Sequence, residues 1–169
     1  DSTKIAVGKG IGYVSIYGST LGNSLTYYEI NDGIMPVDWS TDGSKIIAGT
    51  STGEIKIWNS SIGALLATYT GHTDQVSALA FSPNGQQIAS ASFDGTVRVW
   101  SVATGQQIAS FTKPQSFTTS IAWNPDGTQL AFGGDNGTLE IVSVPLAPTA
   151  TPTVDASPTP VTTDEPCHR

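Results

Sequence analysis

The chain has 169 residues and a formal net charge of −7, because fourteen Asp and Glu side chains outnumber seven Lys and Arg. So few cations argue against sequence-independent binding to nucleic acid or to anionic lipid. No apolar run approaches the roughly 20 residues that a membrane-spanning helix needs. Gly is abundant and only 12% of the residues are charged, a balance typical of an all-β protein rich in turns.

The first unit of the chain, residues 1–30, predicts three strands. Residues 4–8 and 12–17 match a pair of segments in the next unit, at 45–49 and 53–58, and a further strand is expected at residues 25–30. By this match the unit holds its second, third and fourth strands, and its first strand is absent. The chain begins at Asp1 without a Met, so we expect an upstream segment to have been removed or left out.

Two complete units follow, residues 31–70 and residues 71–112, and each predicts four strands. Phe81-Ser82-Pro83-Asn84-Gly85 returns in the following unit as Trp123-Asn124-Pro125-Asp126-Gly127. Pro and Gly suit the turn in this block, and Asp94-Gly95 suits a tight hairpin between two strands. A period of about 40 to 45 residues with strand-type alternation is typical of four-stranded propeller blades.

The fourth unit, residues 113–144, predicts three strands, because Pro145 and Pro148 interrupt the place of a fourth and Pro cannot donate to a β-ladder. The sequence therefore predicts fourteen strands in units of three, four, four and three. The expected fold class is all-β: a partial propeller of four-stranded antiparallel blades over residues 1–144.

Residues 145–169 form a tail rich in Pro and Thr, which has little apolar surface to bury and which we expect to be disordered or extended. Such tracts are common in exposed stalks, so the tail favours an extracellular or cell-surface location in a bacterial-type cell. Cys167, the single cysteine, cannot form an internal disulfide. A haem attachment motif would need a second cysteine where Asp164 stands.

The unit at 71–112 resembles the WD-repeat family. The residues that carry the resemblance are Gly71-His72, Ser90, Ser92, Asp94 and Trp100. The resemblance implies a propeller in which His72, Ser90 or Ser92, Asp94 and Trp100 form a buried hydrogen-bond network within one blade. The other units depart from this pattern, and even this one ends in Trp100-Ser101 where the family has Trp-Asp.

No residue pattern predicts catalysis. A histidine held by a carboxylate, as His72 beside Asp94, can act as a general base. The position of the pair in the repeat favours a structural role, and no motif places a nucleophile. Two histidines and one cysteine at separate places make no metal-ligand spacing. We therefore expect no catalytic residue, no metal and no cofactor.

Asp38 stands where the next two units have Ala80 and Ala122, on a predicted first strand. A carboxylate at such a position needs hydrogen-bond partners, must face the axial channel, or must be neutralised. A local hydrogen bond and a functional channel site both remain open.

One end of the predicted blades gathers the loops that join the fourth strand to the next first strand and the second strand to the third. Aromatic side chains beside polar groups on exposed loops are candidate anchors for a partner. With Asp38, the candidate partner-binding residues are Phe93, Phe117, Lys113 and Asp74.

A partial propeller leaves strand edges and blade faces uncovered, so we expect association. Our first hypothesis is a non-catalytic protein–protein interaction scaffold, a half-propeller completed by another protein chain or by the upstream half of the same precursor. The second is a sensor or substrate-positioning domain of a larger enzyme. The third is an architectural subunit whose tail braces a complex.

Overall fold

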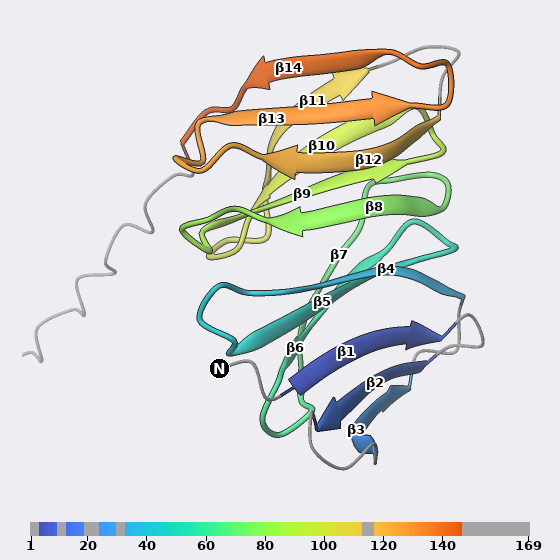
Figure 1. The fold of residues 1–169 in the computed structure, drawn as a ribbon, viewed down its shortest axis with the longest axis vertical. Coiled ribbons are helices and arrows are strands. Elements are labelled where there is room, and N and C mark those ends of the chain that lie inside the picture. The colour runs from blue at the N-terminus through green and yellow to red at the C-terminus, as the bar shows by residue number, and fades with distance from the viewer. Residues whose placement is uncertain (1–3, 10–12, 19–23, 30–32, 113–116, 147–169) are drawn as a thin grey trace, which may run out of the picture.

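The computed structural model describes residues 4–9, 13–18, 24–29, 33–112 and 117–146. Within these residues fourteen strands form four antiparallel sheets. The sheets follow one another along the long axis of the molecule, and the sheets that hold the first and last strands lie at opposite ends (Figure 1). The predicted all-β fold of antiparallel blades is confirmed, whereas most of the predicted tail lies outside the described residues.

Each sheet is an up-and-down meander. Sheet I contains β1 (Lys4–Lys9), β2 (Tyr13–Gly18) and β3 (Ser24–Glu29). Sheet II contains β4 (Ile34–Trp39), β5 (Lys45–Thr50), β6 (Ile55–Asn59) and β7 (Leu65–Tyr69). Sheet III contains β8 (Val76–Phe81), β9 (Gln87–Ser92), β10 (Thr96–Ser101) and β11 (Gln107–Thr112). Sheet IV contains β12 (Thr118–Trp123), β13 (Gln129–Gly134) and β14 (Leu139–Ser143).

The repeated turn block explains why the strand spacing is constant. In sheet II the Ser40 hydroxyl accepts the Lys45 N–H at 2.9 Å, and in sheet III the Ser82 hydroxyl accepts the Gln87 N–H at 2.9 Å. Each turn also contains a glycine with positive φ, such as Gly85 at 69°, a conformation that L side chains rarely adopt. The same side-chain cap therefore closes the first hairpin of successive sheets.

The core consists of three layers, one between each pair of neighbouring sheets. Each of sheets II, III and IV contributes a large aromatic residue to the layer with the preceding sheet, namely Trp58, Trp100 and Phe132. Between sheets III and IV, for example, Leu130 and Phe132 pack with Ala89, Val97 and Val99, and all five side chains are buried. The two other layers are built in the same way. Sheets II and III thus each pack one face on the sheet before and the other face on the sheet after.

Candidate functional site

A buried hydrogen-bond network lies in sheet III. His72, in the loop before β8, lies with Nδ1 2.9 Å from Asp94 Oδ2 and Nε2 2.8 Å from Ser90 Oγ. Trp100 on β10 donates its indole N–H to the same Ser90 oxygen at 2.8 Å. The meander thus brings together a loop, two strands and a hairpin turn that are separated in the sequence.

The protonation states of the network follow from its surroundings. Burial lowers the pKa of His72, and the Asp94 carboxylate partly opposes that effect. Burial alone would raise the pKa of Asp94, but hydrogen bonds from Thr96, His72 and the Thr73 N–H outweigh it and hold the pKa at about 2. A carboxylate can only accept, so the proton of a neutral His72 sits on Nδ1, and Nε2 accepts the Ser90 hydroxyl.

This Ser-His-Asp arrangement is closed to a substrate. The Ser90 side chain is fully buried, and its oxygen already accepts the Trp100 N–H. Asp94 is occupied by the hydroxyl and the N–H of Thr96, at 2.6 and 2.8 Å. The groups satisfy one another, which is what buried polar side chains require. The geometry therefore supports a structural role for His72, Ser90, Asp94 and Trp100.

Two details of the network lay beyond the sequence pattern. The sequence left Ser90 and Ser92 as alternatives, and the structure places Ser90 beside His72. The Ser92 hydroxyl instead donates to Asp74 O at 2.8 Å and accepts the Asp94 N–H. Thr96 was missed, although an Asp side chain in a turn commonly accepts the backbone N–H two residues further on, as Asp94 accepts that of Thr96.

In sheets II and IV the central serine of the network is replaced by an apolar side chain. The position of Ser90 is held by Ala48 in sheet II and by Phe132 in sheet IV, both buried. The position of Trp100 keeps Trp58 in sheet II but is Val142 in sheet IV. The positions equivalent to His72 in these units, Ile30 and Pro114, lie outside the described residues. Among its described residues, sheet IV keeps only the hairpin part of the network, in which the N–H and hydroxyl of Thr138 donate to Asn136 Oδ1 at 3.1 and 2.7 Å.

Two predicted partner-binding residues meet on the loop end of the molecule. The rings of Phe93 and Phe117 lie 5.0 Å apart between centroids at an interplanar angle of 58°. Phe117 is 52% exposed, and Phe93 is half-buried beside it. Asp74 is exposed on the loop before β8, and Lys113 lies outside the described residues. The structure therefore forms an aromatic pair from the loops of sheets III and IV.

Asp38 connects two sheets. Its Oδ2 accepts the Phe81 N–H on β8 at 2.9 Å, and its Oδ1 accepts the Trp39 N–H at 2.8 Å. Burial raises the pKa of this carboxyl group, and the two backbone N–H groups partly offset that rise. The carboxylate therefore joins the first strands of sheets II and III.

The described residues contain no cluster of three or more His, Cys, Asp or Glu side chains that could hold a metal ion. No helix long and apolar enough to cross a membrane occurs among them either.

Comparison with known proteins agrees with this architecture. The family model WD40, described as "WD domain, G-beta repeat", matches residues 30–59, 63–101 and 105–142. No curated protein matches the chain. The second match begins with β7 and runs through β8, β9 and β10, so the repeat takes the outer strand of one sheet and the first three strands of the next. Because the matches cover more than half of its residues, the chain belongs to the WD40 family.

Proposed function

We propose that this chain is a non-catalytic interaction scaffold, a partial propeller that another polypeptide completes by docking on its terminal sheets. WD40 repeats are generally protein-interaction scaffolds and are typically non-catalytic. The observation that carries the proposal is the outer face of sheet IV. On β14, Leu139 is 70% exposed and Ile141 is 63% exposed, whereas Val97 and Val99, at the same positions of sheet III, are fully buried.

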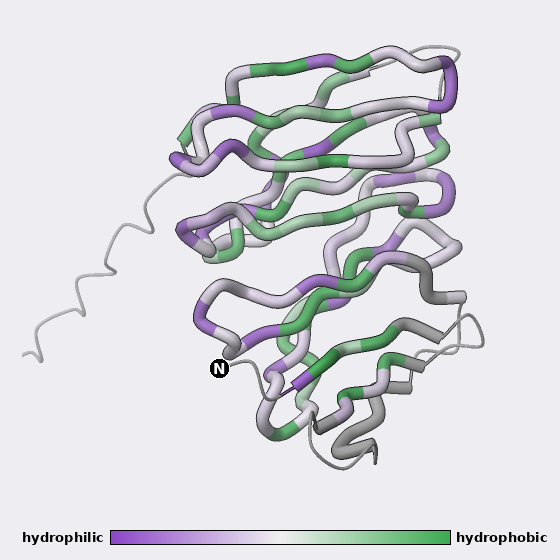
Figure 2. The backbone as a smooth tube through the Cα atoms, in the orientation of Figure 1, coloured by the Kyte–Doolittle hydropathy of each residue, from purple (hydrophilic) through white to green (hydrophobic). Residues whose placement is uncertain are grey.

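The repeat indicates what covers such a face. In sheet III the face that carries Val97 and Val99 packs with Leu130 and Phe132 from sheet IV. The same face of sheet IV forms the end of the described stack, and apolar segments run along β14 there (Figure 2). Burying one Leu or Ile side chain contributes about 1.5–3 kcal/mol. A partner that supplies a sheet with large side chains toward β14 would gain this free energy.

The N-terminal end carries the opposite kind of surface. On β1, Ile5 is 56% exposed and Val7 is 38% exposed, and their counterparts in sheet II, Ile46 and Ala48, are fully buried against sheet I. Ile5 and Val7 thus lie on the type of face that packs onto a preceding sheet. The outer face of sheet IV is thus of the type that packs on a following sheet, and the outer face of sheet I is of the type that packs on a preceding one. A single polypeptide that closes a ring would contact both ends.

The test is capture of the partner from the native source with the whole chain as bait, followed by mass spectrometry. Leu139→Asp combined with Ile141→Asp is expected to abolish capture, because it places two carboxylates on the outer face of sheet IV. Leu146→Asp is the matched control, since Leu146 is 77% exposed but lies beyond β14. Equal recovery of the same partner by the double variant and by the control would contradict the proposal.

A further inference from the structure

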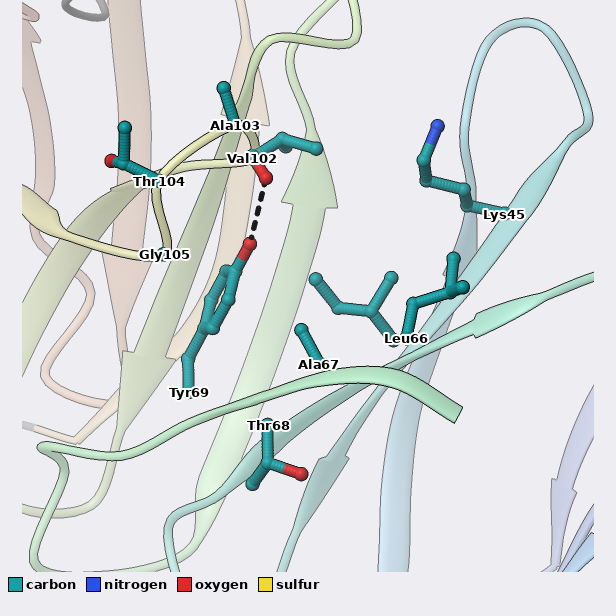
Figure 3. A pocket seen from close by; sticks show the side chains of 10 residues that line it. Lys45, Leu66, Ala67, Thr68, Tyr69, Val102, Ala103, Thr104 and Gly105 are labelled. Atoms are coloured by element: carbon teal, nitrogen blue, oxygen red, sulfur yellow. Dashed lines mark hydrogen bonds between the residues drawn. The ribbon is translucent and has the colours of Figure 1, made fainter. Parts of the chain in front are cut away.

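A cavity of about 530 Å³ opens at the outer rim, between β7 of sheet II and the β10–β11 turn of sheet III. Its lining includes Lys45, Leu66, Tyr69 and the turn residues 102–105. Figure 3 shows Lys45 and Leu66 across the cavity from Tyr69 and that turn. None of these residues belongs to the terminal faces described above.

One wall of the cavity is preformed. The Tyr69 hydroxyl donates to Val102 O at 3.2 Å and to Ser101 O at 3.3 Å. Burial raises the pKa of Tyr69, so the phenol stays protonated and able to donate at neutral pH. A Cβ atom at Gly105 would lie 3.1 Å from Tyr69 Cε1, so the turn packs closely on the ring. Hydrogen bonds and close packing therefore hold the tyrosine against the turn.

The corresponding junction between sheets III and IV is bridged differently. There Gln87 occupies the position of Lys45, and its side-chain amide donates to Pro145 O at 2.7 Å. Gln87 is only 2% exposed. Phe111, at the position of Tyr69, has no hydroxyl for the turn, so the glutamine makes this link instead. At the junction of sheets II and III the tyrosine makes it, and Lys45 Nζ donates to Ser44 Oγ at 3.3 Å.

Leu66 lines the cavity and is 52% exposed, and Leu65 on the same strand is 54% exposed. The strand that carries the two leucines is the edge of its sheet, because β7 pairs with β6 and with no other described strand. Such an edge offers backbone N–H and C=O groups to an added strand.

Lys45 is the charged side chain in the lining of the cavity. The nearby Asp42 carboxylate accepts hydrogen bonds from the hydroxyls of Ser40 and Ser44, at 2.6 and 2.8 Å, and the positive charge of Lys45 also helps to lower the pKa of Asp42. The Lys45 ammonium donates to a neutral hydroxyl and has two further N–H groups. A carboxylate that enters the cavity would therefore compete with Asp42 for the Lys45 ammonium, which lines the cavity together with Ile57 and Leu66.

We propose that an extended polypeptide segment binds along the open edge of β7, with an apolar side chain in the cavity and a carboxylate at Lys45. The edge strand argues for a peptide over a free small molecule, because it offers a row of backbone hydrogen bonds. This site is independent of the terminal faces, so a partner could occupy it whether or not the propeller is completed.

The probe is a library of random heptapeptides displayed on phage and selected on the immobilised full chain. The expected peptides combine large apolar residues with Asp or Glu, and they bind Lys45→Gln about tenfold more weakly, as loss of a hydrogen bond to a charged group predicts. Lys45→Gln introduces the residue type that occupies this position, as Gln87, at the junction of sheets III and IV. Lys56→Gln is the matched control, since Lys56 lies on β6 outside the cavity and pairs with Glu54 at 2.7 Å.

A second measurement tests the mode of binding. Two versions of an enriched peptide are made, one methylated at the odd-numbered backbone nitrogens and one at the even-numbered ones. Only one of the two should bind much more weakly, because only one edge of an added strand faces β7. Fluorescence anisotropy of the labelled peptide measures both effects. The proposal is overturned if no peptide is enriched, or if enriched peptides bind Lys45→Gln as tightly as the wild type. Octanoate serves as a small molecule with an apolar chain and a carboxylate. The proposal is also overturned if octanoate occupies the cavity while no peptide does.

Discussion

The backbone N–H of Phe81 donates to the Asp38 carboxylate at 2.9 Å and so joins the first strand of sheet III to the first strand of sheet II. The next junction makes a different link, since Trp123 donates its indole N–H to Ala80 O at 3.3 Å. In both junctions a side chain from one inner strand binds the backbone of its neighbour. Neighbouring sheets are therefore held by specific hydrogen bonds in addition to their apolar layers.

Replacement of Asp38 tests the first of these links. Asp38→Ala removes the acceptor for the Phe81 N–H and is expected to lower the free energy of unfolding by about 1–3 kcal/mol, the cost of an unsatisfied buried donor. Asp38→Asn keeps one acceptor oxygen and should cost less. Urea unfolding followed by tryptophan fluorescence measures both variants. Equal stability of Asp38→Ala and the wild type would show that the link contributes nothing.

The raised pKa of Asp38 predicts a pH dependence. The folded state holds the Asp38 proton more tightly than the unfolded state, so this group's contribution to stability falls as pH rises from the ordinary value of 3.8 through the raised pKa. Asp38→Asn cannot ionise. The difference in unfolding free energy, wild type minus variant, should therefore decrease across that interval. A difference that increases with pH would mean that the hydrogen bonds outweigh the burial.

Ser90 is the central oxygen of the buried network. Ser90→Ala removes the acceptor of the Trp100 N–H and the hydroxyl beside His72, so we expect a loss of about 1–3 kcal/mol in unfolding free energy. Ser92→Ala provides the comparison, because the Ser92 hydroxyl bonds to backbone groups of Asp74 and Asp94 and not to His72. A smaller loss in Ser90→Ala than in Ser92→Ala would contradict the assignment of Ser90 to the network.

The aromatic pair at the loop end is predicted to bind a partner. Phe117→Ser removes a ring that is already 52% exposed, so it should reduce capture of the partner more than it reduces stability. Thr119→Ala, an exposed change two residues away, serves as the control. Capture and thermal unfolding are measured on the same preparations. If Phe117→Ser unfolds at a lower temperature but captures the partner normally, the ring has a structural role.

Much of the fold could be predicted from the sequence, because the turn residues repeat at a constant spacing. Ser82-Pro83-Asn84-Gly85 and its counterparts are local signals, so they locate the hairpins without knowledge of tertiary contacts. The alternation of Val97 and Val99 with Arg98 likewise shows which residues share a face. These local features are sufficient to predict the number of strands and their grouping into sheets.

The remaining features depend on how neighbouring sheets are aligned. The contact between Asp38 and Phe81 joins residues 43 positions apart in the sequence, and a strand pattern does not show which N–H lies opposite a carboxylate. The rim cavity exists because the Tyr69 side chain contacts the turn that follows β10, whereas the Lys45 side chain does not bridge to that turn. This difference is recognised only by comparison with the junction of sheets III and IV, where Gln87 makes the link. Contacts between sheets, unlike turns, have no signature within a single repeat.

Light scattering on the purified chain tests the central claim, that the terminal sheets are docking faces, most directly. We predict that the isolated chain associates through these faces, and that Leu139→Asp combined with Ile141→Asp reduces this association while Leu146→Asp leaves it unchanged. A stable, compact monomer that remains monomeric at high concentration, with the same behaviour in the double variant, would contradict the claim.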